Sequence, residues 1–138
     1  MVLSTLKGSV SAGGKSTGAG LGNQGALALS EDGQWLFAVD AGSNEISTFA
    51  ISDIGLVLVA RASSGGTLPI SVTTHGNRLY VLNAGGSGNV NGFTVQSDGY
   101  LKAIPGSTRP LSTSGSSPAQ IGVDKDGDTL VVTEKATN

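Results

Sequence analysis

LALSEDGQWLFAV, at residues 27–39, recurs in altered form twice more in this chain of 138 residues. The second copy is ISVTTHGNRLYVL at residues 70–82, and the third is IGVDKDGDTLVVT at residues 121–133. Each copy has two alternating apolar runs on either side of a glycine, which is Gly33, Gly76 or Gly127. Alternation with a period of two predicts a strand, and glycine supplies the positive φ of a tight turn. Each copy therefore predicts a β-hairpin.

The first two copies are each followed by a second matching unit. ISTFAI at residues 46–51 corresponds to VNGFTV at residues 90–95. Turns follow at residues 52–55 and 96–99, and a fourth strand is predicted from residue 56 to about 62 and from 100 to about 105. The three glycines of the hairpins are 43 and 51 residues apart. Four strands in such a period are typical of a β-propeller blade.

The repeat predicts an all-β fold, a β-propeller fragment with about two full four-stranded blades and partial blades at both ends. One partial propeller domain covers residues 1–138. Its predicted parts are the outer strand of a preceding blade (1–12), two blades (25–62 and 69–105) and the inner hairpin of a further blade (119–138). No segment has the i, i+3, i+4 apolar spacing of a helix. Unfinished terminal blades expose strand edges, so we expect this piece to self-associate or to need the missing blades.

Composition narrows the classes of partner. The net charge is −2 and no basic stripe is present, which argues against nucleic acid. There is no cysteine, hence no disulfide or thiolate metal site. No apolar run approaches the roughly 20 residues that span a bilayer, and residues 1–7 lack the pattern of a signal peptide. We expect no membrane partner. The cytoplasm is the preferred compartment, and export stays open.

Three local motifs invite other interpretations. GGKST at residues 13–17 resembles a P-loop, but Ser9 stands where the first glycine belongs, so a crossing between blades is favoured. DKDGD at residues 124–128 resembles a calcium loop, but Lys135 occupies its twelfth position, so a hairpin turn is favoured. His75, the one histidine, aligns with Asp32 and is expected to be an exposed turn residue rather than a general base. We therefore expect neither a metal site nor a cofactor.

Residues 25–39 and 41–49 resemble the repeat of the propeller lactonases. This family includes 6-phosphogluconolactonases of the propeller type and proteins labelled 3-carboxymuconate cyclase, the cycloisomerase 2 family. Residues 61–81, 82–89, 105–110 and 131–138 resemble one bacterial branch of it. The resemblance implies a seven-bladed ring of well over twice this length. It also implies the hydrolysis or formation of a lactone of a sugar acid or a muconate.

Loops before the inner strands and between second and third strands gather on one face of such a ring, around its channel. A lactonase needs a carboxylate to activate water and a cation or amide to stabilise the oxyanion. Asp40 and Glu134 are the candidate bases, and Arg109 or Lys135 is the candidate anion-binding group. The candidate substrate-binding residues are Asn23, Gln24, Asn83, Gln120 and Lys135. The alternative interpretation is that all of these are loop caps and solvated charges.

The sequence is compatible with two functions. The first is a lactonase or lactonising cyclase whose partner is a small-molecule lactone or sugar acid. The second is a non-catalytic propeller module for binding or scaffolding, because a propeller fold does not by itself imply a reaction.

Overall fold

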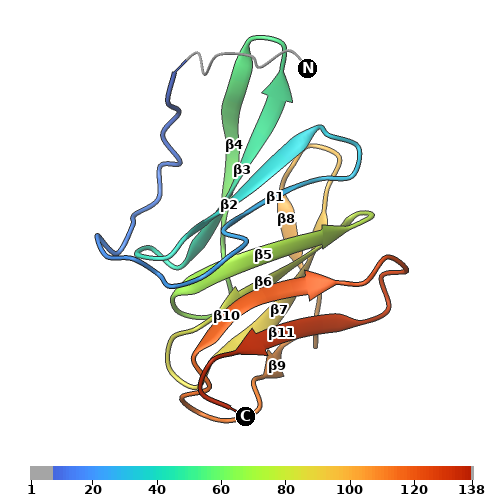
Figure 1. Cartoon of the computed structure of the whole chain (residues 1–138). Helices are drawn as coiled ribbons and strands as arrows, with labels where there is room; N and C mark the ends of the chain where they lie inside the picture. Colours follow the sequence, from blue (N-terminus) through green and yellow to red (C-terminus); the bar gives the residue numbers. More distant parts are fainter. Residues whose placement is uncertain (1–7, 138) are drawn as a thin grey trace, which may run out of the picture.

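The computed structural model describes residues 8–137 (Figure 1). These residues form β-strands β1 to β11 without any helix, so this part of the chain contains no helix able to cross a membrane. The strands assemble into three antiparallel sheets, which we call blade 1, blade 2 and blade 3 in chain order. The all-β propeller architecture predicted from the repeat is confirmed.

Blade 1 is a complete four-stranded meander in the order β1-β2-β3-β4. Its strands are β1 (Leu27–Leu29), β2 (Trp35–Asp40), β3 (Glu45–Ser52) and β4 (Gly55–Ser63). Neighbouring strands are joined by short turns, as the repeat predicts. Residues 8–12, predicted as the end of a preceding outer strand, form no strand and pair with none of β1 to β11. Residues 1–7, the rest of that prediction, lie outside the described residues.

Blade 2 follows the same order, but its outer strand is interrupted. Its strands are β5 (Pro69–His75), β6 (Arg78–Asn83), β7 (Asn89–Val95) and β8 (Leu101–Ala103), and β9 (Arg109–Pro110) also pairs with β7. The interruption is a turn in which the Ser107 amide donates to Ile104 O at 3.1 Å. Pro105, inside this turn, has no amide hydrogen to offer the ladder. Blade 3 is the hairpin of β10 (Pro118–Val123) and β11 (Leu130–Glu134).

The register of the three inner hairpins corrects the glycine-based alignment. Leu27 lies opposite Ala38, Val72 opposite Val81 and Ile121 opposite Val132. Val72 therefore takes the place of Leu27, although the alignment had matched Leu27 with Ile70. The reason is turn length, since the hairpin of blade 2 closes around two residues between His75 and Arg78 and is shorter than the other two.

Blade 2 lies between blades 1 and 3, and an apolar cluster fills each junction (Figure 1). The first cluster joins Phe37 and Ile46 of blade 1 to Val72, Leu79, Val81 and Phe93 of blade 2. The second joins Ile70, Leu82 and Val90 of blade 2 to Ile121 of blade 3. The core thus lies between sheets, and no sheet has a core of its own.

Phe37 is fully buried at the junction of blades 1 and 2, so its truncation measures the strength of this contact. We expect Phe37→Ala to lower the free energy of unfolding by about 3–5 kcal/mol, measured by urea denaturation. Tyr100→Ala is the control, because Tyr100 is 55% exposed, and should cost less than about 1 kcal/mol. Equal losses in the two variants would contradict the packing described.

Candidate functional site

The three inner hairpins present equivalent loops at one edge of the blades. The loop that enters each hairpin is tied to the loop that leaves it by a backbone hydrogen bond at the same place in the repeat. The amides of Gly42, Gly85 and Ala136 donate to Lys15 O, Thr67 O and Ser116 O at 2.7, 2.9 and 3.1 Å. The candidate site residues of the sequence lie on or next to these loops, which we call the loop edge.

Four of the five predicted substrate-binding residues meet in one hollow at the loop edge. This loop-end hollow has a volume of about 480 Å³. It is lined by Gly22, Asn23, Gln24, Ala119, Gln120, Thr133 and Lys135. The segment before β1 thus faces blade 3 across the end of β5, and residues as many as 113 positions apart share one cavity.

Hydrogen bonds between blades connect the walls of this hollow. Lys135 Nζ donates to Gly22 O at 2.9 Å, and the Gln24 amide donates to Ala119 O at 3.1 Å. The Asn23 side-chain amide donates to Ile70 O of blade 2. The exposed ammonium of Lys135 keeps two hydrogens available beyond its bond to Gly22. The hollow therefore presents an ammonium group and side-chain amides to a ligand.

Asn83, the fifth predicted substrate-binding residue, lies away from the hollow. Its side chain is completely buried, and its Nδ2 donates to Ser64 O at 3.2 Å and to Asn89 Oδ1 at 2.8 Å. These bonds connect the loop between blades 1 and 2 to the end of β6. In this structure Asn83 ties two loops together and does not reach solvent.

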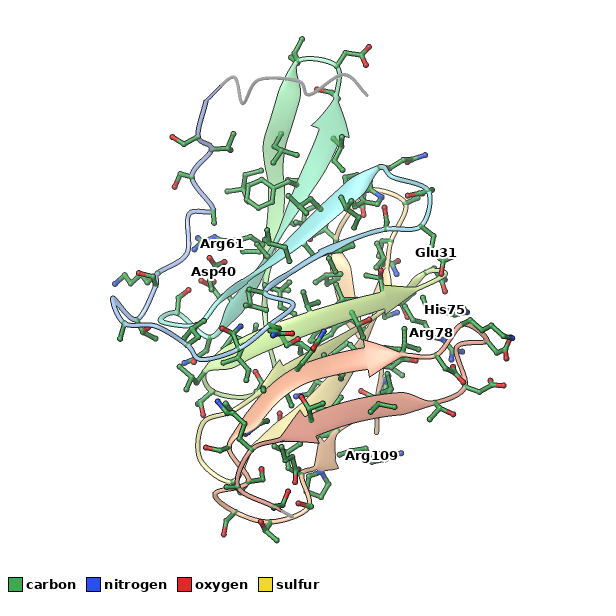
Figure 2. The ribbon with its side chains drawn as sticks, in the orientation of Figure 1. Glu31, Asp40, Arg61, His75, Arg78 and Arg109 are labelled. Atoms are coloured by element: carbon green, nitrogen blue, oxygen red, sulfur yellow. The ribbon has the colours of Figure 1, made fainter. Side chains whose placement is uncertain are left out.

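Asp40 occupies the equivalent position at the end of β2 and is also buried, with 7% of its surface exposed. A Cβ at Gly14 would overlap the Asp40 carboxyl group, so only glycine lets the crossing loop lie this close. Burial raises the pKa of Asp40 above its ordinary value of 3.8, and the Glu45 carboxylate adds to the increase. The Ser47 hydrogen bond and Arg61 oppose the shift (Figure 2).

Ser47 links the Asp40 carboxyl group to the crossing loop. Ser47 Oγ lies 2.6 Å from Asp40 Oδ2 and 2.9 Å from Ala12 O. A serine hydroxyl has one hydrogen, so it donates to only one of these two oxygens at a time. Ser47 therefore stabilises the charged Asp40 carboxylate only while its hydroxyl points to Oδ2.

Blade 2 has amide donors at both of the equivalent positions. Asn91 stands in blade 2 where Ser47 stands in blade 1, and its Nδ2 donates to Ser64 O, the counterpart of Ala12 O, at 3.2 Å. Asn83, the counterpart of Asp40, donates to the same carbonyl. Blade 2 thus has a neutral amide donor at the position where blade 1 has the Asp40 carboxyl group.

Glu134 and Arg109, the remaining predicted catalytic residues, line a second hollow of about 320 Å³ between β9 and β11. Hydrogen bonds from Ser112 and Thr137 lower the pKa of Glu134 below its ordinary value of 4.5. Arg109 is exposed and donates to Gly106 O at 2.7 Å and to Thr108 O at 2.8 Å. The two residues share a hollow, but within the described chain no ion pair joins them.

The opposite edge of the blades carries the hairpin turns and His75 (Figure 2). His75 is the last residue of β5, and its Nδ1 lies 3.3 Å from Glu31 Oε1 of blade 1. A Cβ at Gly127 of blade 3 would overlap the imidazole. His75 therefore touches the turns of both neighbouring blades, a contact that the alignment with Asp32 did not suggest.

The two ligand-like motifs have structural roles. Residues 13–17 lead no helix and form the crossing loop beside blade 1, as favoured from the repeat. Asp124 Oδ1 accepts the amides of Asp128 and Thr129 at 2.9 and 3.1 Å, which confirms a hairpin turn at residues 124–128. In the described range, His, Asp and Glu residues form no group of three that could hold a metal ion.

Comparison with known proteins places this geometry in a family. A family model described as a lactonase with a seven-bladed β-propeller matches residues 3–107. The chain belongs to this family of propeller lactonases. The match covers blade 1, strands β5 to β8 of blade 2 and the turn that follows β8. It confirms the resemblance seen in the repeat.

Solved structures share the lactonase propeller fold with this chain. A functionally unknown protein from Desulfotomaculum acetoxidans superposes with a TM-score of 0.66 at 23% identity, over 79% of this chain and 34% of that one. A candidate 6-phosphogluconolactonase from Bacteroides uniformis gives 0.65 at 24% identity, over 88% and 38%. The periplasmic gluconolactonase of Pseudomonas aeruginosa gives 0.55 at 22% identity, over 79% and 33%. This lactonase-family chain spans about a third of each of them. No curated protein matches it.

Replacing Asp40 by asparagine tests the direction of its pKa shift. The pKa of folded Asp40 is raised, so its contribution to stability is complete below its ordinary pKa near 3.8 and is lost as pH rises through the folded value. Asparagine keeps a donor at all pH values. We expect Asp40→Asn to be more stable than the parent chain at pH 7, with an advantage that shrinks as pH falls towards 3.8.

The measurement is urea denaturation across this pH range, taken as the difference between variant and parent chain. Asp53→Asn, in the exposed turn between β3 and β4, is the matched control and should show no such trend. A destabilised Asp40→Asn chain at pH 7, with a pH profile parallel to that of the parent, would show that the pKa of Asp40 is not raised.

Proposed function

We propose that this chain supplies part of the substrate-binding wall of a propeller lactonase that acts on the lactone of a sugar acid. The observation that supports the proposal is the convergence of Asn23, Gln24, Gln120 and Lys135 on the loop-end hollow. These residues come from blades 1 and 3, and Asn23 is anchored on blade 2. Such a site depends on the packing of three blades.

The donors of the hollow match the oxygens of a lactone. Ring opening places negative charge on the former carbonyl oxygen, and N–H donors that point towards it stabilise that charge. Lys135 provides the cation. Its Nζ donates one hydrogen to Gly22 O, and the other two are available to the ligand. The side-chain amides of Gln24 and Gln120 are suited to the hydroxyl groups of a sugar acid.

The group that activates water comes, in this proposal, from outside the hollow. Its lining residues include no carboxylate and no imidazole. Glu134 precedes Lys135 in the chain, but its carboxylate binds Ser112 and Thr137 in the second hollow. A ring several times the size of this piece has other blades whose loops reach the same channel.

The second candidate function is non-catalytic binding of a sugar acid. The composition of the hollow favours it, because amide and ammonium donors recognise a ligand without activating water. The two functions make different predictions for turnover and the same prediction for the role of Lys135.

Lys135→Gln tests the proposal through both binding and turnover. Loss of a charge-assisted hydrogen bond costs about 1.5–3 kcal/mol, so affinity should fall roughly tenfold or more. We expect this loss in calorimetric titration with gluconate, a stable sugar acid. In assays of 6-phosphogluconolactone and gluconolactone hydrolysis by the complete ring, which supplies the water-activating group, kcat/KM corrected for spontaneous ring opening should fall by a similar factor.

Lys125→Gln is the matched control, because Lys125 is an exposed lysine in the hairpin turn of blade 3 at the opposite edge. It should leave both measurements unchanged. Gluconate binding without hydrolysis of either lactone or of carboxymuconolactone would favour the binding module. If gluconate does not bind, or if the two lysine variants behave alike, the hollow is not the site.

A further inference from the structure

A third hollow lies between blades 1 and 2 at the edge that carries the hairpin turns, where Figure 2 shows Glu31 and His75. We call it the turn-edge hollow, and its volume is about 480 Å³. Blade 1 contributes the turn between β1 and β2 and the first residue of β2, which is Trp35. Blade 2 contributes its turns before β6 and after β7. Both walls belong to consecutive blades whose junction is filled by the first apolar cluster, so no further blade can enter between them.

Trp35 lines this hollow at a position where the blade itself requires no aromatic side chain. In the register of the hairpins its counterparts are Arg78 in blade 2 and Thr129 in blade 3. A Cβ at Gly99 would overlap the six-membered ring of the indole, so the turn between β7 and β8 lies directly against it. The indole also packs on the first apolar cluster. Its position is therefore fixed before any ligand binds.

Two carboxylates of the turn-edge hollow each have one oxygen engaged by the protein. Asp32 Oδ1 accepts the Ser30 hydroxyl at 2.6 Å and the Gln34 amide at 3.0 Å. These bonds lower the pKa of Asp32 below its ordinary value of 3.8, so Asp32 is ionised at neutral pH. Glu31 Oε1 accepts the Gly76 amide at 2.9 Å. Within the described chain Asp32 Oδ2 and Glu31 Oε2 accept no hydrogen bond, so both are available to a ligand.

Three side-chain amides complete the polar lining. Gln34 O accepts the Ile51 amide at 2.9 Å, and Asn77 O accepts the Val95 amide at 2.8 Å. The backbone of these two residues thus serves the sheets, while their side chains line the hollow together with that of Gln96. Each amide group has both donors and an acceptor. Among the described residues that line the hollow there is no lysine, arginine or histidine.

We propose that the turn-edge hollow binds an uncharged saccharide. A sugar ring has hydroxyl groups around its rim and C–H groups on its faces. It can therefore bury one face against an indole while its hydroxyls bond to carboxylates and amides. The amides favour hydroxyl groups over an organic ammonium, because their N–H donors find no acceptor on a cation.

The charge of this hollow is opposite to that of the loop-end hollow. A sugar acid would meet the carboxylates of Glu31 and Asp32 here without a cation to balance its charge. In the loop-end hollow the ammonium group of Lys135 faces the ligand. The two hollows lie at opposite edges of the blades, so a neutral sugar and a sugar acid occupy separate sites. The saccharide site does not depend on the proposed lactonase function.

Fluorescence titration tests the proposal, because Trp35 is the single tryptophan of the chain and its emission reports on this hollow alone. The probes are the methyl glycosides of glucose, galactose, mannose and N-acetylglucosamine, which are uncharged and keep their rings closed. We expect a saturable change in emission with at least one of them. Gluconate, as an anion, and tetramethylammonium, as a cation, should leave the emission unchanged at the concentration that saturates the glycoside signal.

Asp32→Asn should weaken glycoside binding roughly fivefold, because a hydrogen bond to a charged acceptor is about twice as strong as one to a neutral acceptor. Asp126→Asn is the matched control, since Asp126 occupies the same turn position in blade 3 and lies outside the hollow, and it should bind like the parent chain. Trp35→Leu should abolish glycoside binding in calorimetric titration.

Lys135→Gln separates this site from the loop-end hollow. It should leave glycoside binding unchanged, and Asp32→Asn should leave gluconate binding unchanged. The proposal is overturned if no glycoside gives a saturable signal, or if tetramethylammonium gives one in place of the sugars. Equal affinities of Asp32→Asn and Asp126→Asn, or a loss of glycoside binding in Lys135→Gln, would overturn it as well.

Discussion

A four-stranded blade has two faces and no interior, and this constraint governs the whole molecule. Phe37 is buried only because blade 2 lies against blade 1, and Ile121 only because blade 3 lies against blade 2. Burial of apolar area is the main favourable term in folding, so each blade depends on its neighbours for most of its stability. The packing of blade on blade therefore decides which loops meet, where the hollow forms and which faces are exposed.

Stacking also explains why one repeat position has three different chemical environments. Asp40, Asn83 and Glu134 all end the second strand of a hairpin. Gly14 and Gly66 let the crossing loop press on the first two, so both side chains are buried. A Cβ at Gly115, the counterpart in blade 3, would meet open space, and Glu134 reaches hydroxyl donors at the surface. The contact with the crossing loop therefore decides whether this position joins loops or faces solvent.

Much of the fold could be predicted from the sequence, because strand alternation and turn glycines act locally. Gly33, Gly76 and Gly127 all have positive φ, and the three hairpins follow the predicted order. The register of blade 2 could not be predicted from the glycine alone, since a two-residue turn shifts Val72 into the place of Leu27. The break between β8 and β9 was also missed, although Pro105 signalled it.

The candidate site, like the fold, has some features that local sequence predicts and others that depend on distant contacts. The repeat predicts that the loops carrying Asn23, Gln24, Gln120 and Lys135 lie at one edge of stacked sheets, and the structure brings these four residues into one hollow. The burial of Asp40 depends on a glycine 26 positions earlier in the chain, and no local pattern reveals that contact. Sequence repeats therefore identify which residues share an edge. Which of them reach the ligand is decided by the packing of the loops that cross between blades.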